Sequence, residues 1–142
     1  MSFDVSKFVG LPWREHGRDF DGLDCWGLVY LIYLHELRIE LPSYVDEYEN
    51  TVDAKHLKKV YDQNMTAWSM LIHDQPRIFD VALMRVRGHP IHVGIYLEPG
   101  KMLHIEDGLN SVIEAYNGLQ WQNRLIGFFR HERRFDSNTE KT

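Results

Sequence analysis

Apolar residues are most concentrated early in the chain, where every position from 28 to 34 is hydrophobic. A run that is apolar on all sides is typical of a helix buried on every face. Asp24 precedes the run and is a favourable N-cap residue, and Pro42 stops any continuation. The pattern therefore predicts a buried helix from about residue 24 to residue 37.

Two segments precede this helix, and a further one follows it. We expect a lead-in with a helical turn over residues 3–12 and a polar loop over residues 13–22, which glycines interrupt. Residues 53–72 carry apolar side chains at helical spacing, which predicts a second helix with one apolar face.

After Pro76 the pattern changes to short apolar segments separated by turn residues, which predicts strands. The predicted strands cover residues 81–87, 91–97, 102–105, 111–116 and 124–130. Because short links join antiparallel neighbours, we expect a five-stranded antiparallel sheet. Helices first and strands after predict the α+β class, with the N-terminal helices packed on one face of the sheet.

Composition limits the class of protein. The length of 142 residues suits one domain, which we expect over residues 1–135, followed by a polar tail at residues 136–142. A formal net charge of −5 argues against a nucleic-acid partner, and one cysteine excludes an internal disulfide. The N-terminus lacks a signal-peptide layout and no apolar run is long enough for a membrane span, so we expect synthesis in the cytoplasm and no membrane partner.

The only cysteine, Cys25, falls in the first turn of the predicted helix. A helix N-terminus favours negative charge, which shifts a thiol toward the nucleophilic thiolate. The alternative is that Cys25 is a small buried hydrophobic residue, as a lone cysteine usually is. A cysteine nucleophile also needs a base and a group that orients the base.

His92 and His104 are candidates for that base and its partner, because they lie on neighbouring predicted strands. If a three-residue loop joins the strands, both histidines face the same side, and Gly94 leaves room for His104 to lean toward His92. A two-residue loop would place them on opposite faces. Two alternatives remain. The histidines can be buried, hydrogen-bonded residues of the core, or they can form a zinc site together with His89.

Three segments together resemble the signature of the NlpC-type papain-like cysteine peptidases. They are residues 24–29 around Cys25, residues 92–96 beginning at His92, and residues 102–104 ending at His104. The resemblance implies a papain-like α+β fold in which Cys25 is the nucleophile, His92 the base and His104 the residue that orients the base. It implies no cofactor and no metal.

The resemblance also assigns residues around the nucleophile. The Cys25 backbone amide would hold the oxyanion, and we place Trp13, Asp24 and Trp26 with it in the oxyanion site or the groove. Trp13 stands where many cell-wall members have a tyrosine, and an indole nitrogen can donate a hydrogen bond but cannot accept one. Trp26 replaces a serine common in the family and either makes the groove more apolar or belongs to the core.

Four further segments resemble the phage and prophage tail-assembly branch of this family. They are residues 20–28, 40–44, 104–108 and 126–131. The resemblance implies hydrolysis of amide bonds in the stem peptides of bacterial cell wall (peptidoglycan), with other phage tail-tip proteins as partners and delivery in a tail particle or by lysis. The alternatives are a structural or assembly component of the tail tip with residual catalysis, and an acyltransferase or amidase.

Overall fold

An antiparallel sheet forms most of the fold. The computed structural model describes residues 3–46 and 66–135, in which six strands pair in the order β3-β8-β4-β5-β6-β7. Each neighbouring pair is antiparallel. The strands are β3 (Trp68–Met70), β4 (Val81–Val86), β5 (His89–Glu98), β6 (Lys101–His104), β7 (Val112–Ala115) and β8 (Leu125–His131). The predicted α+β class is confirmed, with one strand more than the five expected.

The additional strand, β3, corrects part of the predicted second helix. Trp68 pairs with His131 at the end of β8, and only Trp68 of the three β3 residues is buried. A strand with a single buried side chain has no alternation to reveal it, so its pairing with β8 overrides the helical spacing. The remainder of the predicted helix, residues 53–65, lies outside the described residues.

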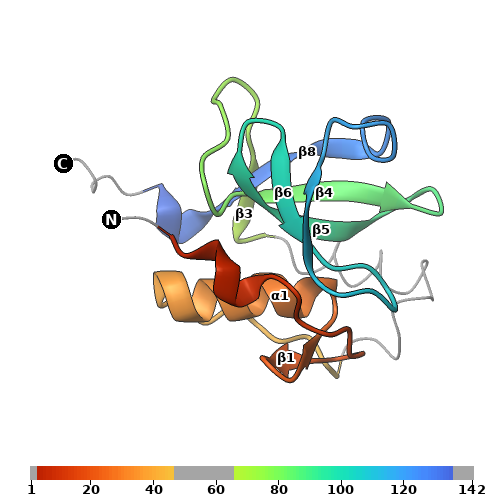
Figure 1. Cartoon of the computed structure of the whole chain (residues 1–142). Helices are drawn as coiled ribbons and strands as arrows, with labels where there is room; N and C mark the ends of the chain where they lie inside the picture. Colours follow the sequence, from red (N-terminus) through yellow and green to blue (C-terminus); the bar gives the residue numbers. More distant parts are fainter. Residues whose placement is uncertain (1–2, 47–65, 136–142) are drawn as a thin grey trace.

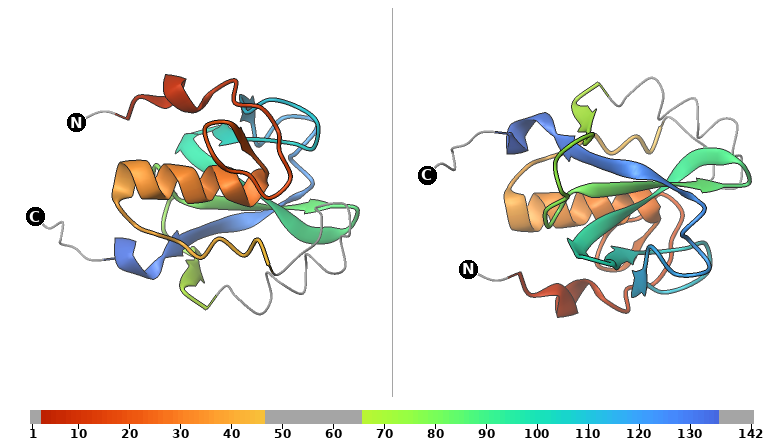
Figure 2. Two further views of the ribbon diagram at one scale, coloured as in Figure 1. Left: turned by 90° about the horizontal axis from the view of Figure 1, so that it is seen from below. Right: turned by 90° about the horizontal axis from the view of Figure 1, so that it is seen from above.

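The predicted cysteine helix is confirmed. It comprises α1 (Cys25–Ile32), followed directly by a π-helical turn, η2 (Tyr33–Leu37). The Asp24 side chain caps it by accepting a hydrogen bond from the Gly27 backbone N–H at 2.8 Å. The helix ends where Arg38 adopts the left-handed conformation, with φ of 56°. Figures 1 and 2 show α1 lying across one face of the sheet.

The segment before α1 is more ordered than the polar loop that the sequence predicts. It contains a 3-10 helix, η1 (Val5–Phe8), and a small hairpin of β1 (Arg18–Asp19) and β2 (Gly22–Leu23). The hairpin packs over the first turn of α1, where a Cβ atom on Gly27 would lie 2.0 Å from the Gly17 carbonyl oxygen. Only glycine at position 27 allows this close approach. No helix in the described ranges is long and apolar enough to cross a membrane.

The sheet has apolar clusters on both faces. The larger one fills the space between the sheet and α1 and includes Val93 and Ile95 of β5. A smaller cluster on the opposite face is made of Ala82, Met84, Met102 and Trp121. Because side chains alternate along a strand, His92 shares the face of this smaller cluster rather than the face covered by α1.

A buried ion network closes the end of β4 that is farther from His92. The Asp80 carboxylate is fully buried and accepts from Arg130 Nε and Nη2 at 2.9 and 2.7 Å. Arg134 Nη1 donates to the same carboxylate at 2.6 Å. The hydrogen bond to Asp80 raises the pKa of Arg130. The network ties the start of β4 to the end of β8 and to the 3-10 helix η3 (Glu132–Arg134).

We expect Asp80→Ala to lower the free energy of unfolding by about 3–5 kcal/mol, because it leaves the Arg130 guanidinium buried without its partner. Urea unfolding measures the change. Asp21→Ala removes an exposed carboxylate and serves as the matched control. A loss for Asp80→Ala no larger than that of the control would contradict the role of the network.

Candidate active site

Two histidines contact each other on the face of the sheet opposite α1. His92 Nε2 and His104 Nδ1 are 2.8 Å apart, within hydrogen-bond distance, and both residues are buried. The pairing of Ile95 with Leu103 sets this register. A Cβ atom on Gly94 would lie 3.1 Å from His104 Cβ, so the glycine leaves the room that the sequence predicted.

The turn that joins β5 and β6 is shorter than the three-residue loop that this register was expected to need. Glu98 pairs with Lys101, which leaves only Pro99 and Gly100 in the loop. A two-residue loop alone would place the histidines on opposite faces. The register shifts between Tyr96 and Glu98, and this irregularity restores the pairing expected of a three-residue loop.

Cys25 lies at the N-terminus of α1, beside the start of β5. Its side chain is 5% exposed, and Sγ is 3.9 Å from the Ile91 carbonyl oxygen. Cys25 and His92 line the same cavity, whose volume is about 240 Å³. The thiol and the imidazole, distant in sequence, therefore border one cavity.

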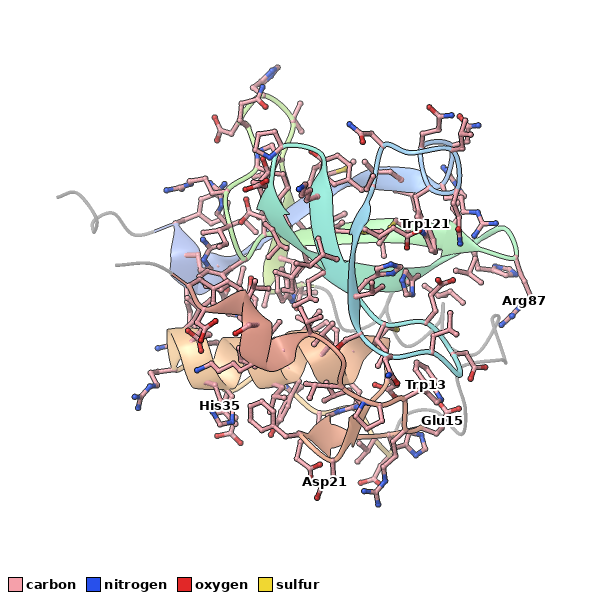
Figure 3. The ribbon with its side chains drawn as sticks, in the orientation of Figure 1. Trp13, Glu15, Asp21, His35, Arg87 and Trp121 are labelled. Atoms are coloured by element: carbon pink, nitrogen blue, oxygen red, sulfur yellow. The ribbon has the colours of Figure 1, made fainter. Side chains whose placement is uncertain are left out.

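The cavity walls come from several segments. Val86 and Arg87 belong to the β4–β5 hairpin, and Trp121 to the segment before β8. Trp13 lines the cavity from the N-terminal segment and also packs against the main core. Figure 3 shows Trp13, Arg87 and Trp121 projecting from these different elements. The remaining lining residues are Ile91, Ile105, Glu106, Asp107 and Leu109.

Asp24 lies outside the cavity wall and holds the end of the helix instead. It is fully buried, and Oδ1 accepts from Arg18 Nη1 at 2.7 Å as well as from the Gly27 N–H. Its second oxygen, Oδ2, accepts from the His16 N–H at 3.0 Å. These bonds fix the first turn of α1, and through it the position of Cys25.

Trp26 also lies away from the cavity. It is 2% exposed, and its Nε1 donates to the Pro42 carbonyl oxygen at 2.8 Å. Its ring lies 5.4 Å from Tyr44 and 6.3 Å from Trp68 between centroids. Of the two readings that the sequence left open, the structure favours the core.

Glu114 and Trp121 complete the site and were missed by the sequence analysis. His104 Nε2 is 2.7 Å from Glu114 Oε1, and Trp121 Nε1 donates to the same oxygen at 3.2 Å. The Trp121 ring stacks on His92 with a centroid distance of 5.1 Å and an interplanar angle of 14°. Glu114 pairs with Met102, which shares a face with His104, so the register of the predicted strands 102–105 and 111–116 could have indicated it.

His92 is a neutral imidazole over the ordinary pH range. Burial, with smaller contributions from His104 and Arg124, lowers its pKa from 6.5 to about 3. A neutral imidazole can accept a proton from a neighbouring thiol.

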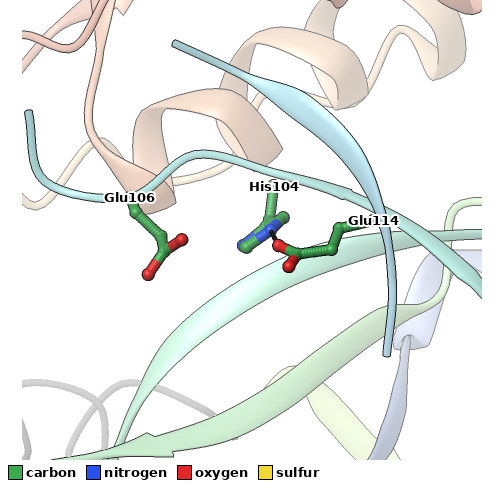
Figure 4. A group of neighbouring side chains, drawn as sticks. All are labelled: His104, Glu106 and Glu114. Atoms are coloured by element: carbon green, nitrogen blue, oxygen red, sulfur yellow. Dashed lines mark hydrogen bonds and ion pairs between the residues drawn. The ribbon is translucent and has the colours of Figure 1, made fainter. Parts of the chain in front are cut away.

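One group of side chains in the described part of the chain has metal-ligand chemistry. The group consists of His104, Glu106 and Glu114 (Figure 4), whose ligand atoms lie within 4.8 Å of one another. Both ring nitrogens of His104 already face partners, His92 on one side and Glu114 on the other. A metal bound to His104 would have to replace one of these contacts. The zinc site of His89, His92 and His104 that the sequence left open shares only His104 with this group.

The arrangement has the parts that nucleophilic acyl transfer requires. A thiol at a helix N-terminus, a neutral imidazole in the same cavity and a second imidazole bound to the first can supply nucleophile, base and orienting group. The Cys25 backbone N–H at the start of α1 can stabilise an oxyanion.

Comparisons with known proteins point to one family. The model of the NlpC/P60 family matches residues 10–130. The solved NlpC/p60 domain of the peptidoglycan hydrolase SagA is 19% identical over 88% of this chain and 90% of that chain, with a TM-score of 0.56.

Two longer proteins contain a similar fold. An NLP/P60 family protein of Staphylococcus aureus, described as similar to a lipoprotein, is 23% identical over 92% of this chain and 43% of that chain, with a TM-score of 0.60. An NlpC/P60 family protein of Bacillus cereus is 20% identical over 87% of this chain and 36% of that chain, with a TM-score of 0.63. The chain spans less than half of each of these two proteins, and the likeness establishes the fold.

The lowered pKa of His92 predicts a stability that depends on pH. Below pH 6.5 the unfolded chain binds a proton at this position that the folded protein does not, so the free energy of unfolding falls as the pH decreases toward 3. Urea unfolding at several pH values measures the slope. His92→Gln should reduce it.

His131 provides the control for this experiment. Burial lowers the pKa of His131 as well. His131→Gln should therefore remove only the contribution of His131 to the pH dependence of the free energy of unfolding, and the contribution of His92 should remain. Carboxylates contribute equally to the wild type and both variants. Equal slopes for the wild type and His92→Gln would contradict a neutral buried His92.

Proposed function

The chain belongs to the NlpC/P60 family, and we propose on this premise that it is a cysteine peptidase that hydrolyses amide bonds in peptidoglycan stem peptides. The observation that carries the proposal is the cavity lined by both Cys25 and His92, with His104 bound to His92. The similar fold of the NlpC/p60 domain of SagA, a peptidoglycan hydrolase, supports the substrate class.

In the proposed reaction His92 takes the proton of the Cys25 thiol, and Sγ attacks the carbonyl carbon of the scissile amide. The Cys25 N–H donates to the oxyanion of the tetrahedral intermediate. His92 then protonates the leaving amine, and an acyl-enzyme remains on Cys25. Water, deprotonated by His92, hydrolyses the thioester and regenerates the thiol.

The cavity chemistry is compatible with a short peptide that carries both signs of charge. Arg87, Glu106 and Asp107 all line the cavity. Trp13 and Trp121 line the same cavity and add apolar surface. Stem peptides contain carboxylates and amines within a few residues, so both signs of charge in the cavity have suitable partners.

We expect the purified protein to shorten stem peptides in isolated peptidoglycan, measured by mass spectrometry of the released fragments. Cys25→Ala should lower the rate by at least about a thousandfold, because the nucleophile is removed. Trp26→Phe, a core substitution outside the cavity, is the control and should retain the activity of the folded fraction. Equal fragment release by Cys25→Ala and the wild type would refute the proposal.

The same digest separates two alternative functions. A folded wild type that releases no fragment would favour a tail-tip structural or assembly role. Transfer of the acyl group to an added amine without hydrolysis would favour an acyltransferase.

We propose further that the protein acts in association with a phage or prophage tail, which would deliver it to the cell wall in a tail particle or at lysis. The support is the resemblance of residues 20–28, 40–44, 104–108 and 126–131 to tail-assembly proteins.

Antibodies against the chain should therefore detect it in purified phage particles produced from the genome that encodes it. A particle-free lysate from the same culture is the control. Detection in the lysate with none in the particles would exclude incorporation in the tail and leave delivery by lysis.

A further inference from the structure

His104 uses both ring nitrogens, and its partners define where its proton lies. Nε2 faces Glu114 Oε1 at 2.7 Å, and Nδ1 faces His92 Nε2 at 2.8 Å. Trp121 Nε1, which can only donate, is bonded to the same Glu114 oxygen at 3.2 Å. That oxygen is therefore an acceptor, and the hydrogen in the contact with His104 belongs to His104 Nε2.

The direction of the next hydrogen bond follows. For a neutral His104, which carries one N–H, a proton on Nε2 leaves Nδ1 as an acceptor. His92 Nε2 must then be the donor in the bond between the histidines. The single proton of a neutral His92 lies on Nε2, and its Nδ1 carries a free lone pair.

We propose that Glu114 is a positioning residue that sets the tautomers of both histidines and so makes His92 Nδ1 the nitrogen that takes the Cys25 proton. The inference rests on the proposed peptidase function for its kinetic consequence. The tautomers themselves can be tested without any substrate.

Trp121 strengthens this role of Glu114. Its ring is 1% exposed, stacks on His92 and meets the His104 ring edge-on at 5.3 Å with an interplanar angle of 89°. It thus confines both imidazoles while its N–H keeps an acceptor oxygen directed toward the network. The Glu114 side chain is 32% exposed, so substitutions there can be accommodated at the surface.

Three substitutions at Glu114 separate the hydrogen-bond role from charge and packing. Glu114→Gln keeps an acceptor oxygen, which Trp121 Nε1 holds toward His104, and should retain kcat within about threefold. Glu114→Lys presents only donors, so it favours the reversed chain in which His92 Nδ1 carries the proton. This variant should lower kcat by at least about a hundredfold, as a wrong histidine tautomer does in serine peptidases, with little change in KM. Glu114→Ala should fall between the two.

Glu98→Lys is the matched control for the change in charge. It lies at the exposed end of β5, where its side chain is 62% exposed, and should leave kcat unchanged. Equal losses for Glu114→Gln and Glu114→Lys would overturn the tautomer role, because both variants lack the carboxylate but differ in the ability to accept.

Nitrogen-15 NMR of histidine-labelled protein provides the readout that is independent of activity. The wild type and Glu114→Gln should show protonated Nε2 and bare Nδ1 at both His92 and His104, and Glu114→Lys should show the reverse. A protonated His92 Nδ1 in the wild type would overturn the inference even if the peptidase activity is established. The expected tautomers in a protein without turnover would uphold the assignment and refute only the proposed function.

Discussion

The two-residue alternation along β5 is the constraint on which the rest of the site depends. Val93 and Ile95 must face α1 to fill the main core, so His92 and Gly94 must face the other side. The apolar residues that stabilise the fold thereby determine where the imidazole can be. A shift of one residue would exchange the two sets and would lose both the core and the histidine pair.

The other half of the site depends on the end of a helix. Asp24 is buried with Arg18 and the Gly27 N–H as partners, so the first turn of α1 is held by charge-assisted hydrogen bonds as well as by packing. Cys25 follows Asp24 directly in the chain, so the fixed first turn also fixes the position of Cys25. The nucleophile candidate is therefore carried by a rigid element, and the base candidate by the centre of a sheet.

Burial and hydrogen bonding have complementary effects on the histidines. Burial keeps His92 neutral, while the sequence of contacts through His104 to Glu114 gives each ring nitrogen a defined role. A buried polar network of this kind is stable only when every member has a partner, and Trp121 supplies the last donor to Glu114.

The sequence alone determined the features that depend on neighbours along the chain. The apolar run and Asp24 predicted α1 and the place of Cys25 in its first turn, and the short alternating segments predicted five of the six strands of the sheet. The signature segments also identified the family that the comparisons then established. These signals are local because helix capping and strand periodicity act over a few residues.

Contacts between distant segments decided the rest. β3 exists only because Trp68 pairs with β8, and the histidines meet only because an irregularity near Leu97 corrects a two-residue turn. Glu114 and Trp121 reach His104 through the pairing of β6 with β7 and the fold of the segment before β8. A one-residue change in register reverses a side chain's face at almost no local cost, so hydrophobic pattern alone does not specify these contacts, whereas the packed sheet does.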